Sequence, residues 1–170
     1  MRIAENNVMS QPSLVCGGTI AAVVWLLGVA TPAASGQTPL PWGLEIRLLP
    51  DYTHEQLRGE HGPTGKFTKK GGLEVHYFMG RIGRPDEAPT SGDFHSAAVR
   101  VPEPDRLWLK EQNVAGRHVH VAYTKDRRLM VSSASTKEGV NFTAVAESPG
   151  DVADVLLMVL SLAEPQARDK

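Results

Sequence analysis

The sequence predicts an α+β fold, in which an antiparallel sheet of about five to six strands, arranged as hairpins, is covered on one face by one C-terminal helix. Three observations predict this fold. Several short segments alternate apolar and polar residues and are separated by turn residues, as expected of half-buried strands. Strands and helices do not alternate along the chain, so no parallel βαβ unit is indicated. One long apolar segment with helical spacing lies near the C-terminus.

The first strand is predicted where Leu44, Ile46 and Leu48 share one face by strict alternation. Residues 106–112 fit either a helix or a strand, and this choice stays open. The connection at residues 80–95 is long and rich in proline and glycine. The predicted strands and hairpins cover residues 44–49, 65–79 with a turn at 70–72, 117–132 with a turn at 124–127, and 140–145.

The C-terminal helix is predicted from its start signal and its spacing. Ser148 can cap the helix, Pro149 suits the first helical position, and Asp151 can bond back to the cap. From there the pattern predicts a helix that ends near Ala163. The apolar side chains expected on its buried face are Val152, Val155, Leu156, Val159, Leu160 and Ala163, with Leu157, Met158 and Leu162 widening that face.

Residues 1–36 are predicted to be a secretory signal peptide. Residues 14–30 contain no charged side chain, and the small, helix-breaking residues 31–37 follow them. Small side chains suit the signal peptidase at its −3 and −1 positions, so we expect cleavage near Ser35 or Gly36. One alternative is an uncleaved membrane anchor, because the apolar run is just short of a full membrane span. The other is a buried core helix.

Removal of the signal peptide would leave a single α+β domain at residues 37–163 and a polar tail at residues 164–170. Cys16 is the only cysteine of the chain and lies in the apolar run. The domain therefore contains no disulfide and depends on its hydrophobic core for stability. The signal peptide predicts a periplasmic or extracellular protein.

The charge balance limits the classes of partner. Lysine and arginine number 18 and aspartate and glutamate 19, which gives a formal net charge of −1. Binding to nucleic acid relies on a strong basic excess, so no nucleic-acid partner is expected. Contact with a membrane is expected only if residues 14–30 are retained. The composition is compatible with a protein partner or a small ligand.

The sequence holds no complete catalytic motif. A Gly-x-Ser-x-Gly segment is absent. His54 and Glu55 match the first two residues of the His-Glu-x-x-His motif of zinc proteases. Arg58 occupies the position of the second histidine and cannot bind zinc. Residues 62–66 lack the spacing and the serine or threonine of a phosphate-binding loop. The sequence favours a non-enzymatic protein without excluding an enzyme.

His118 and His120 form the one histidine pair whose spacing dictates a shared orientation. Residues two apart on a strand project from the same face, so both imidazoles would stand side by side. His76 has the same outward register on its own predicted strand, beside Glu74. If the two strands are neighbours, three imidazoles and a carboxylate could surround one divalent cation. The alternative is a solvated, histidine-rich face, and we expect no cofactor and at most weak zinc or copper binding.

These observations together predict a small exported non-enzymatic binding or interaction domain, whose ligand the sequence does not identify. Two alternatives remain. One is a histidine-based metal-binding protein or metal-dependent enzyme that uses His118, His120 and His76. The other is a domain tethered to the membrane by an uncleaved N-terminal segment.

Overall fold

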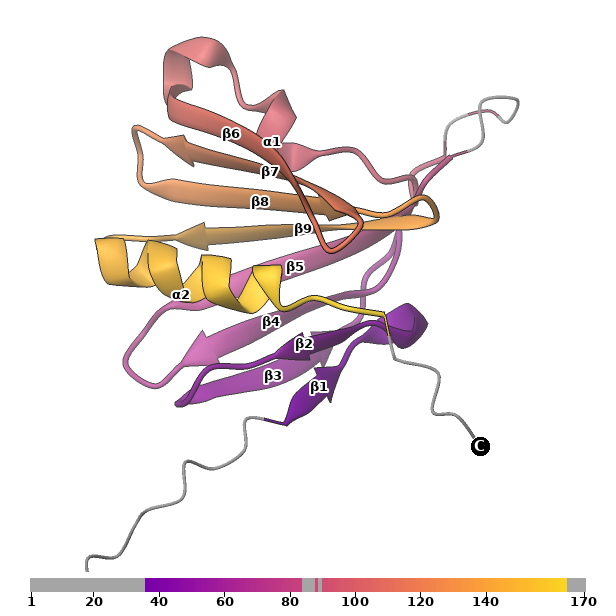
Figure 1. Ribbon diagram of the computed structural model, residues 1–170, viewed down its shortest axis with the longest axis horizontal. Helices are drawn as coiled ribbons and strands as arrows, with labels where there is room; N and C mark the ends of the chain where they lie inside the picture. The colour runs from indigo at the N-terminus through magenta and orange to yellow at the C-terminus, as the bar shows by residue number, and fades with distance from the viewer. Residues whose placement is uncertain (1–35, 84–87, 89, 165–170) are drawn as a thin grey trace, which may run out of the picture. The chain divides into compact units, whose positions relative to one another are not determined.

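An antiparallel sheet of seven strands dominates the computed structural model (Figure 1). The structure describes residues 36–83, 88 and 90–164. The α+β class, the antiparallel sheet and the C-terminal helix are confirmed, but the sheet has more strands than predicted, and a separate two-stranded hairpin accompanies it. The predicted signal peptide up to Ser35 lies outside the described residues, as does the tail after Glu164.

Strands outnumber helices along the described residues. The strands are β1 (Gln37–Pro39), β2 (Glu45–Arg47), β3 (Tyr52–Leu57), β4 (Thr64–Lys69), β5 (Glu74–Arg81), β6 (Arg106–Val114), β7 (Arg117–Thr124), β8 (Arg128–Ala134) and β9 (Glu138–Val145). The helices are α1 (Ala97–Arg100) and α2 (Pro149–Leu160), and the single 3-10 turns are η1 (Pro41–Gly43) and η2 (Glu103–Asp105). Within the described residues no helix is both long and apolar enough to span a membrane.

Two meanders make up the large sheet, whose strand order is β3-β4-β5-β9-β8-β7-β6. The first meander runs from β3 to β5 and the second from β6 to β9, and the antiparallel pairing of β5 with β9 joins them. The segment between β5 and β6 therefore travels from the middle of the sheet to its edge, and it carries α1. Every other connection within the sheet is a local turn, which explains why the sequence shows no crossover helices.

Three stretches differ from the sequence-based expectation. Residues 44–49 form only the short strand β2, which pairs with β1 and not with the large sheet. Residues 106–112, undecided from the sequence, belong to strand β6. The sequence does not predict β3, because His54, Glu55 and Gln56 are polar and the apolar alternation is missing. Polar residues suit β3 because it is an edge strand.

Both predicted hairpins are confirmed. Gly71 and Gly72 connect β4 to β5 with φ angles of 113° and 130°, a conformation that glycine adopts without a steric penalty. β7 and β8 pair in register across the turn that follows Thr124. The register places every second residue of these strands on the same face, as the alternation predicts.

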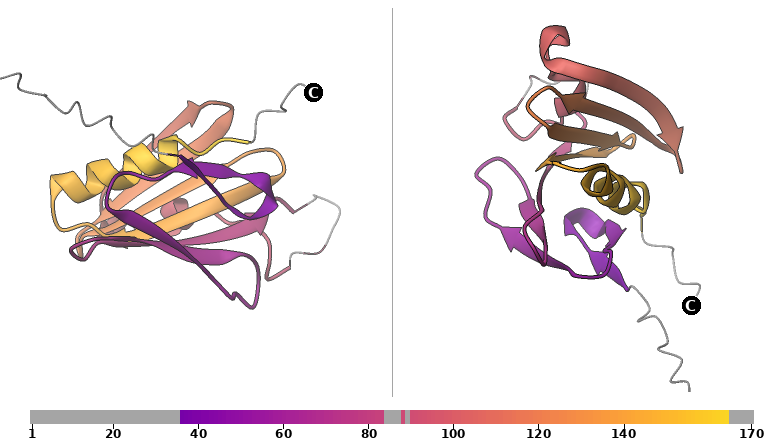
Figure 2. Two further views of the ribbon diagram at one scale, coloured as in Figure 1. Left: turned by 90° about the horizontal axis from the view of Figure 1, so that it is seen from below. Right: turned by 90° about the vertical axis from the view of Figure 1, so that its left-hand side faces the viewer.

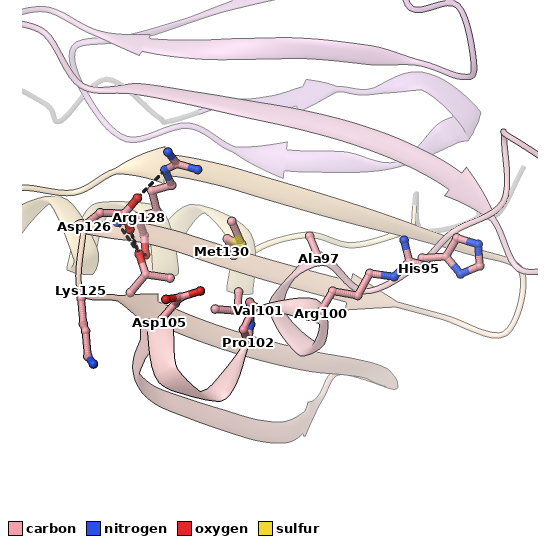
Figure 3. A pocket seen from close by; sticks show the side chains of 11 residues that line it. His95, Ala97, Arg100, Val101, Pro102, Asp105, Lys125, Asp126, Arg128 and Met130 are labelled. Atoms are coloured by element: carbon pink, nitrogen blue, oxygen red, sulfur yellow. Dashed lines mark hydrogen bonds and ion pairs between the residues drawn. The ribbon is translucent and has the colours of Figure 1, made fainter.

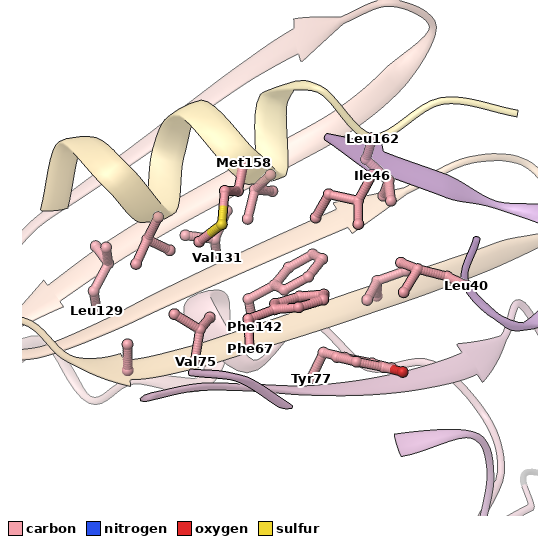
Figure 4. Packing of buried hydrophobic residues seen from close by; sticks show 14 of the residues in the cluster. Leu40, Ile46, Phe67, Val75, Tyr77, Leu129, Val131, Phe142, Met158 and Leu162 are labelled. Atoms are coloured by element: carbon pink, nitrogen blue, oxygen red, sulfur yellow. The ribbon is translucent and has the colours of Figure 1, made fainter. Parts of the chain in front are cut away.

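α2 and the β1–β2 hairpin lie on one face of the sheet, which we call the core face (Figure 2). The main hydrophobic cluster lies between them and the sheet. At its centre the ring of Phe67 stacks on those of Tyr77 and Phe142, at centroid distances of 5.3 Å and 6.5 Å. Figure 4 shows Met158 pointing from α2 toward Val131 on the sheet. Removal of this apolar surface from water is the main source of folding free energy.

α2 begins with the predicted cap. The Ser148 hydroxyl accepts a hydrogen bond from the Asp151 backbone N–H at 3.1 Å, and the Ser148 N–H donates to the Asp151 carboxylate at 3.0 Å. The buried face is rotated from the prediction, because Leu160 is 36% exposed and Leu157 is more than half exposed. The helix side chains that are fully buried are Val155, Met158 and Val159.

The β1–β2 hairpin closes the core beside α2. Ile46 of β2 is fully buried, so the alternation read from the sequence does point this residue into the core. The backbone of Glu45 exchanges two hydrogen bonds with Ala163, at 2.9 Å and 3.0 Å, and the Arg47 N–H donates to the Ser161 hydroxyl at 2.8 Å. The chain after α2 therefore provides the partner for β2 that the large sheet does not.

Candidate functional site

The outer face of the sheet, opposite α2, carries the polar side chains that are available to a ligand. Alternation on β7 buries Val119 and Val121 in the core and turns His118 and His120 outward. Two features stand out on this face. One is a hollow beside α1, and the other is a group of glutamate and histidine side chains at the β6–β7 edge.

Polar groups on β8 and β9 tie α1 to the outer face. The Ser132 hydroxyl accepts a hydrogen bond from the Ala98 N–H at 3.1 Å, and the Asn141 side-chain oxygen accepts one from the Ala97 N–H at 2.9 Å. The Asn141 amide donates to the His95 carbonyl at 2.9 Å, and the Ser132 hydroxyl donates to Asn141 at 2.7 Å. A helix of four residues is not stable by itself, so this network holds α1 in place.

A small apolar cluster adds to this attachment. Ala98 of α1 and the following Val101 pack on Ala122 of β7, with Leu109 and Met130 beside them. Ala122 is fully buried although it lies on the outer face, and Ala98 of α1 is fully buried against the sheet. α1 is therefore held in one position against the outer face of the sheet.

A hollow of about 570 Å³ lies between α1, η2 and the turn that joins β7 to β8 (Figure 3). This volume falls within the range of roughly 300–1,000 Å³ that is typical of small-molecule sites. The hollow is open to solvent and draws its lining from two parts of the chain that are distant in sequence. Its apolar lining residues are Ala97, Val101, Pro102 and Met130.

Charged side chains surround the hollow. Figure 3 shows Arg100 extending toward His95 at the α1 end. At the opposite end, Asp126 and Arg128 form an ion pair of 2.9 Å. A hydrogen bond from the Thr124 hydroxyl, aided by Arg128, keeps the pKa of Asp126 below its usual value, so this carboxylate is ionised. The charged lining residues are Arg100, Asp105, Lys125, Asp126 and Arg128.

Glu111, His118 and His120 converge at the β6–β7 edge, and we call them the Glu–His cluster. The Glu111 carboxylate lies 2.6 Å from Nε2 of His118 and 3.6 Å from Nε2 of His120. The two imidazole ring centres are 4.5 Å apart. One ligand atom from each of the three residues lies within 4.8 Å of the others, which is close enough for all three to contact one ion.

The members of the Glu–His cluster differ in exposure. The His120 side chain is 18% exposed, against 45% for His118 and 60% for Glu111. Burial lowers the pKa of His120, the neighbouring His118 lowers it further, and Glu111 partly offsets both effects. His120 is therefore neutral at pH 7 and carries a lone pair on one ring nitrogen.

His76 does not join this cluster. It lies on β5, whose neighbours are β4 and β9, and β8 separates β9 from β7. The strands that carry His76 and His118 are therefore not neighbours, so the three-histidine arrangement considered from the sequence is not assembled. His76 Nε2 instead lies 3.5 Å from the Glu74 carboxylate, which also pairs with Lys66 at 3.2 Å.

Glu111 is the member of the cluster that the sequence does not reveal, because residues 106–112 fit either a helix or a strand. Ala115 and Gly116 form a two-residue turn in which both φ angles are positive, at 49° and 78°. Such turns join adjacent antiparallel strands in a fixed register, and this one places Glu111 directly opposite His120. Gly116 between two strand-like segments is the signal that could have revealed the pairing.

His54 has a structural environment at the edge of the core. Its Nε2 lies 2.9 Å from the Tyr77 hydroxyl, and its ring centre is 5.2 Å from that of Phe67. Burial lowers the pKa of His54. The hydrogen bond satisfies the Tyr77 hydroxyl, so the pair belongs to the packing of the core face and not to the outer face.

Comparison with known proteins provides no assignment of function. The sequence matches no model of a known protein family, and no curated protein matches it. The hollow and the Glu–His cluster are therefore the features from which a function can be inferred.

Proposed function

We propose that this protein is a small exported, non-enzymatic binding domain and that the hollow beside α1 is its ligand site. The observation that carries the proposal is the hollow itself, with its apolar lining and its volume of about 570 Å³. One side of the hollow is formed by α1, which is held in place by hydrogen bonds that its backbone N–H groups donate to Ser132 and Asn141. A wall that is already ordered reduces the entropy lost when a ligand binds.

The lining favours a small amphiphilic ligand with one anionic group. Val101, Pro102 and Met130 offer apolar contacts for the body of such a molecule. Arg100 offers a planar guanidinium that can donate paired hydrogen bonds to a carboxylate or sulfonate. At the other end of the hollow, Asp105 and Asp126 offset the charges of Lys125 and Arg128, so a second anionic group is not favoured there (Figure 3). The ligand class is therefore an apolar molecule with a single acidic end.

Export is the part of the proposal that rests on sequence. The uncharged residues 14–30 and the small residues 31–37 support a cleaved signal peptide. Mass spectrometry of the intact exported protein should show the loss of about 35 residues. Recovery of the full-length chain from membranes alone would contradict cleavage and favour the tethered form of the domain.

The ligand site can be tested with 8-anilino-1-naphthalenesulfonate, a fluorescent probe that has an apolar aromatic body and one sulfonate. The wild-type protein should bind it saturably with a rise in fluorescence. Met130→Glu places a charge among the apolar lining residues and should weaken binding at least tenfold. Arg100→Ala removes a charge-assisted hydrogen bond worth about 1.5–3 kcal/mol and should weaken binding about tenfold or more.

Lys70→Ala is the matched control, because it removes one exposed cation in a turn outside the hollow. It should leave the affinity for the probe unchanged. Thermal unfolding of each variant establishes that the fold is retained, since partly unfolded proteins also bind this dye. Absence of saturable binding by the wild-type protein, or equal binding by Met130→Glu and Arg100→Ala, would overturn the assignment.

A further inference from the structure

We propose that Glu111, His118 and His120 form a binding site for one divalent transition-metal ion, with Zn²⁺ as the reference ion. The proposed site is separate from the hollow. β7 begins at Arg117 and ends at Thr124, so the Glu–His cluster lies near its start, whereas the hollow lies at its end. The two proposals therefore succeed or fail independently.

The spacing of the donor atoms fits a single ion. Zinc binds imidazole nitrogen and carboxylate oxygen at about 2.0–2.2 Å, so two donors of one tetrahedral ion lie roughly 3.4 Å apart. The Glu111 carboxylate is 2.6 Å from His118 Nε2 and 3.6 Å from His120 Nε2. The two distances involve different oxygens of the Glu111 carboxylate, and rotations of the exposed Glu111 and His118 side chains bring one oxygen and both nitrogens to the tetrahedral separation.

The backbone holds the ligands in position before an ion arrives. His118 and His120 lie on a strand that is paired on both sides, by β6 and by β8. Glu111 lies directly opposite His120 across the β6–β7 pair, and a two-residue turn fixes that register. Packing limits the rotamers of the His120 side chain, whereas the more exposed His118 and Glu111 leave a path for the ion.

The ligand types decide the class of ion. Two imidazoles and one carboxylate suit zinc, copper, nickel and cobalt, whereas calcium and magnesium prefer an all-oxygen shell. Three protein ligands leave one tetrahedral position for water or for a group from another molecule. Each imidazole ring also has a second nitrogen, which can bond to the surroundings and orient the ring.

Calorimetric titration of the purified chain with zinc chloride tests the site. We expect one ion per chain with a dissociation constant on the order of micromolar. Glu111→Gln and His118→Ala should each weaken binding at least tenfold. Both side chains are exposed, so neither substitution should disturb the fold, and circular dichroism can verify this.

His76→Ala is the matched control. His76 is another exposed histidine of the same outer face with a carboxylate within 3.5 Å, but it lies outside the cluster. It should leave the stoichiometry and the affinity unchanged. Absence of saturable heat with millimolar zinc would overturn the proposal. Unchanged zinc binding by both Glu111→Gln and His118→Ala would overturn it as well.

Discussion

The core face and the outer face of the sheet come from the same strands, yet they differ in what covers them. On β9, Phe142 faces α2 and is fully buried, while its neighbours Asn141 and Thr143 face outward and are half-buried. The core face is covered by α2 and the β1–β2 hairpin along the central strands. Among the residues that the structure describes, the outer face is covered where α1 crosses β7 and β8 and where Phe94 packs over Gly80 of β5 and Gly139 of β9.

This difference separates stability from binding. The core face buries large apolar side chains, which contribute most of the free energy of folding. The outer face buries few apolar groups and instead contains polar pairs such as Ser132 and Asn141. Its remaining side chains are free to contact a ligand or an ion, so substitutions there should change binding before they change stability.

The largest expected effect comes from adjacent residues of β9 on opposite faces. Phe142→Ala removes a fully buried ring that stacks on Phe67 and should lower the free energy of unfolding by about 3–5 kcal/mol. Thr143→Ala on the outer face should cost less than about 1 kcal/mol. Urea denaturation measures both values. Similar losses for the two variants would show that the faces do not differ in this way.

A second pair tests the same contrast on α2. Met158 is 1% exposed, whereas Leu157 is 59% exposed. Met158→Ala should lower the free energy of unfolding by about 2–5 kcal/mol, and Leu157→Ala by no more than about 0.5 kcal/mol. Chemical denaturation again provides the measurement. A large loss for Leu157→Ala would mean that the exposed side of α2 is covered by something in solution.

The local parts of the fold are predictable from the sequence because their causes are local. Ser148, Pro149 and Asp151 start α2 through contacts within one helical turn. Gly71 and Gly72 set a hairpin turn in the same way. Strand order is different, since the pairing of β5 with β9 joins residues far apart in the chain. Alternation states which residues share a face but not which strand lies beside them.

The same limit explains which parts of the candidate site are predictable. The common face of His118 and His120 follows from a spacing of two, and the structure shows it. The order of the strands decides the other members: it places Glu111 beside the two histidines and His76 away from them. The hollow combines residues near positions 95–105 with others near 124–130, so no single segment contains its pattern.

Alkaline pH should lower the free energy of unfolding because Tyr77 is buried in the core face. Burial raises the pKa of this phenol from 10.0 to about 12, and the residue is 2% exposed. The unfolded chain therefore releases this proton first, so stability is retained below pH 10 and falls as the pH rises from 10 toward 12. We expect Tyr77→Phe to show a shallower fall over that interval. Equal slopes for both proteins in urea titrations at several pH values would contradict this.

On the outer face, Asn141→Ala should have a moderate effect on stability and a clear effect on α1. The change removes the bonding partners of the Ala97 N–H and the His95 carbonyl, which should cost about 1–3 kcal/mol. Faster hydrogen exchange at the amides of α1 would identify the released segment. Asn113→Ala, at an exposed position of β6, is the control and should change neither property.

The smallest expected effects compare the caps of the two helices. Ser148 caps α2 in a reciprocal pair with Asp151, and Ser148→Ala should lower the free energy of unfolding by about 1 kcal/mol, because α2 covers the core. Ser96 caps α1 through a longer bond of 3.3 Å to the Val99 N–H. Because other contacts also hold α1, Ser96→Ala should cost less than Ser148→Ala in urea denaturation. A larger loss for Ser96→Ala would mean that the outer face contributes to global stability through α1.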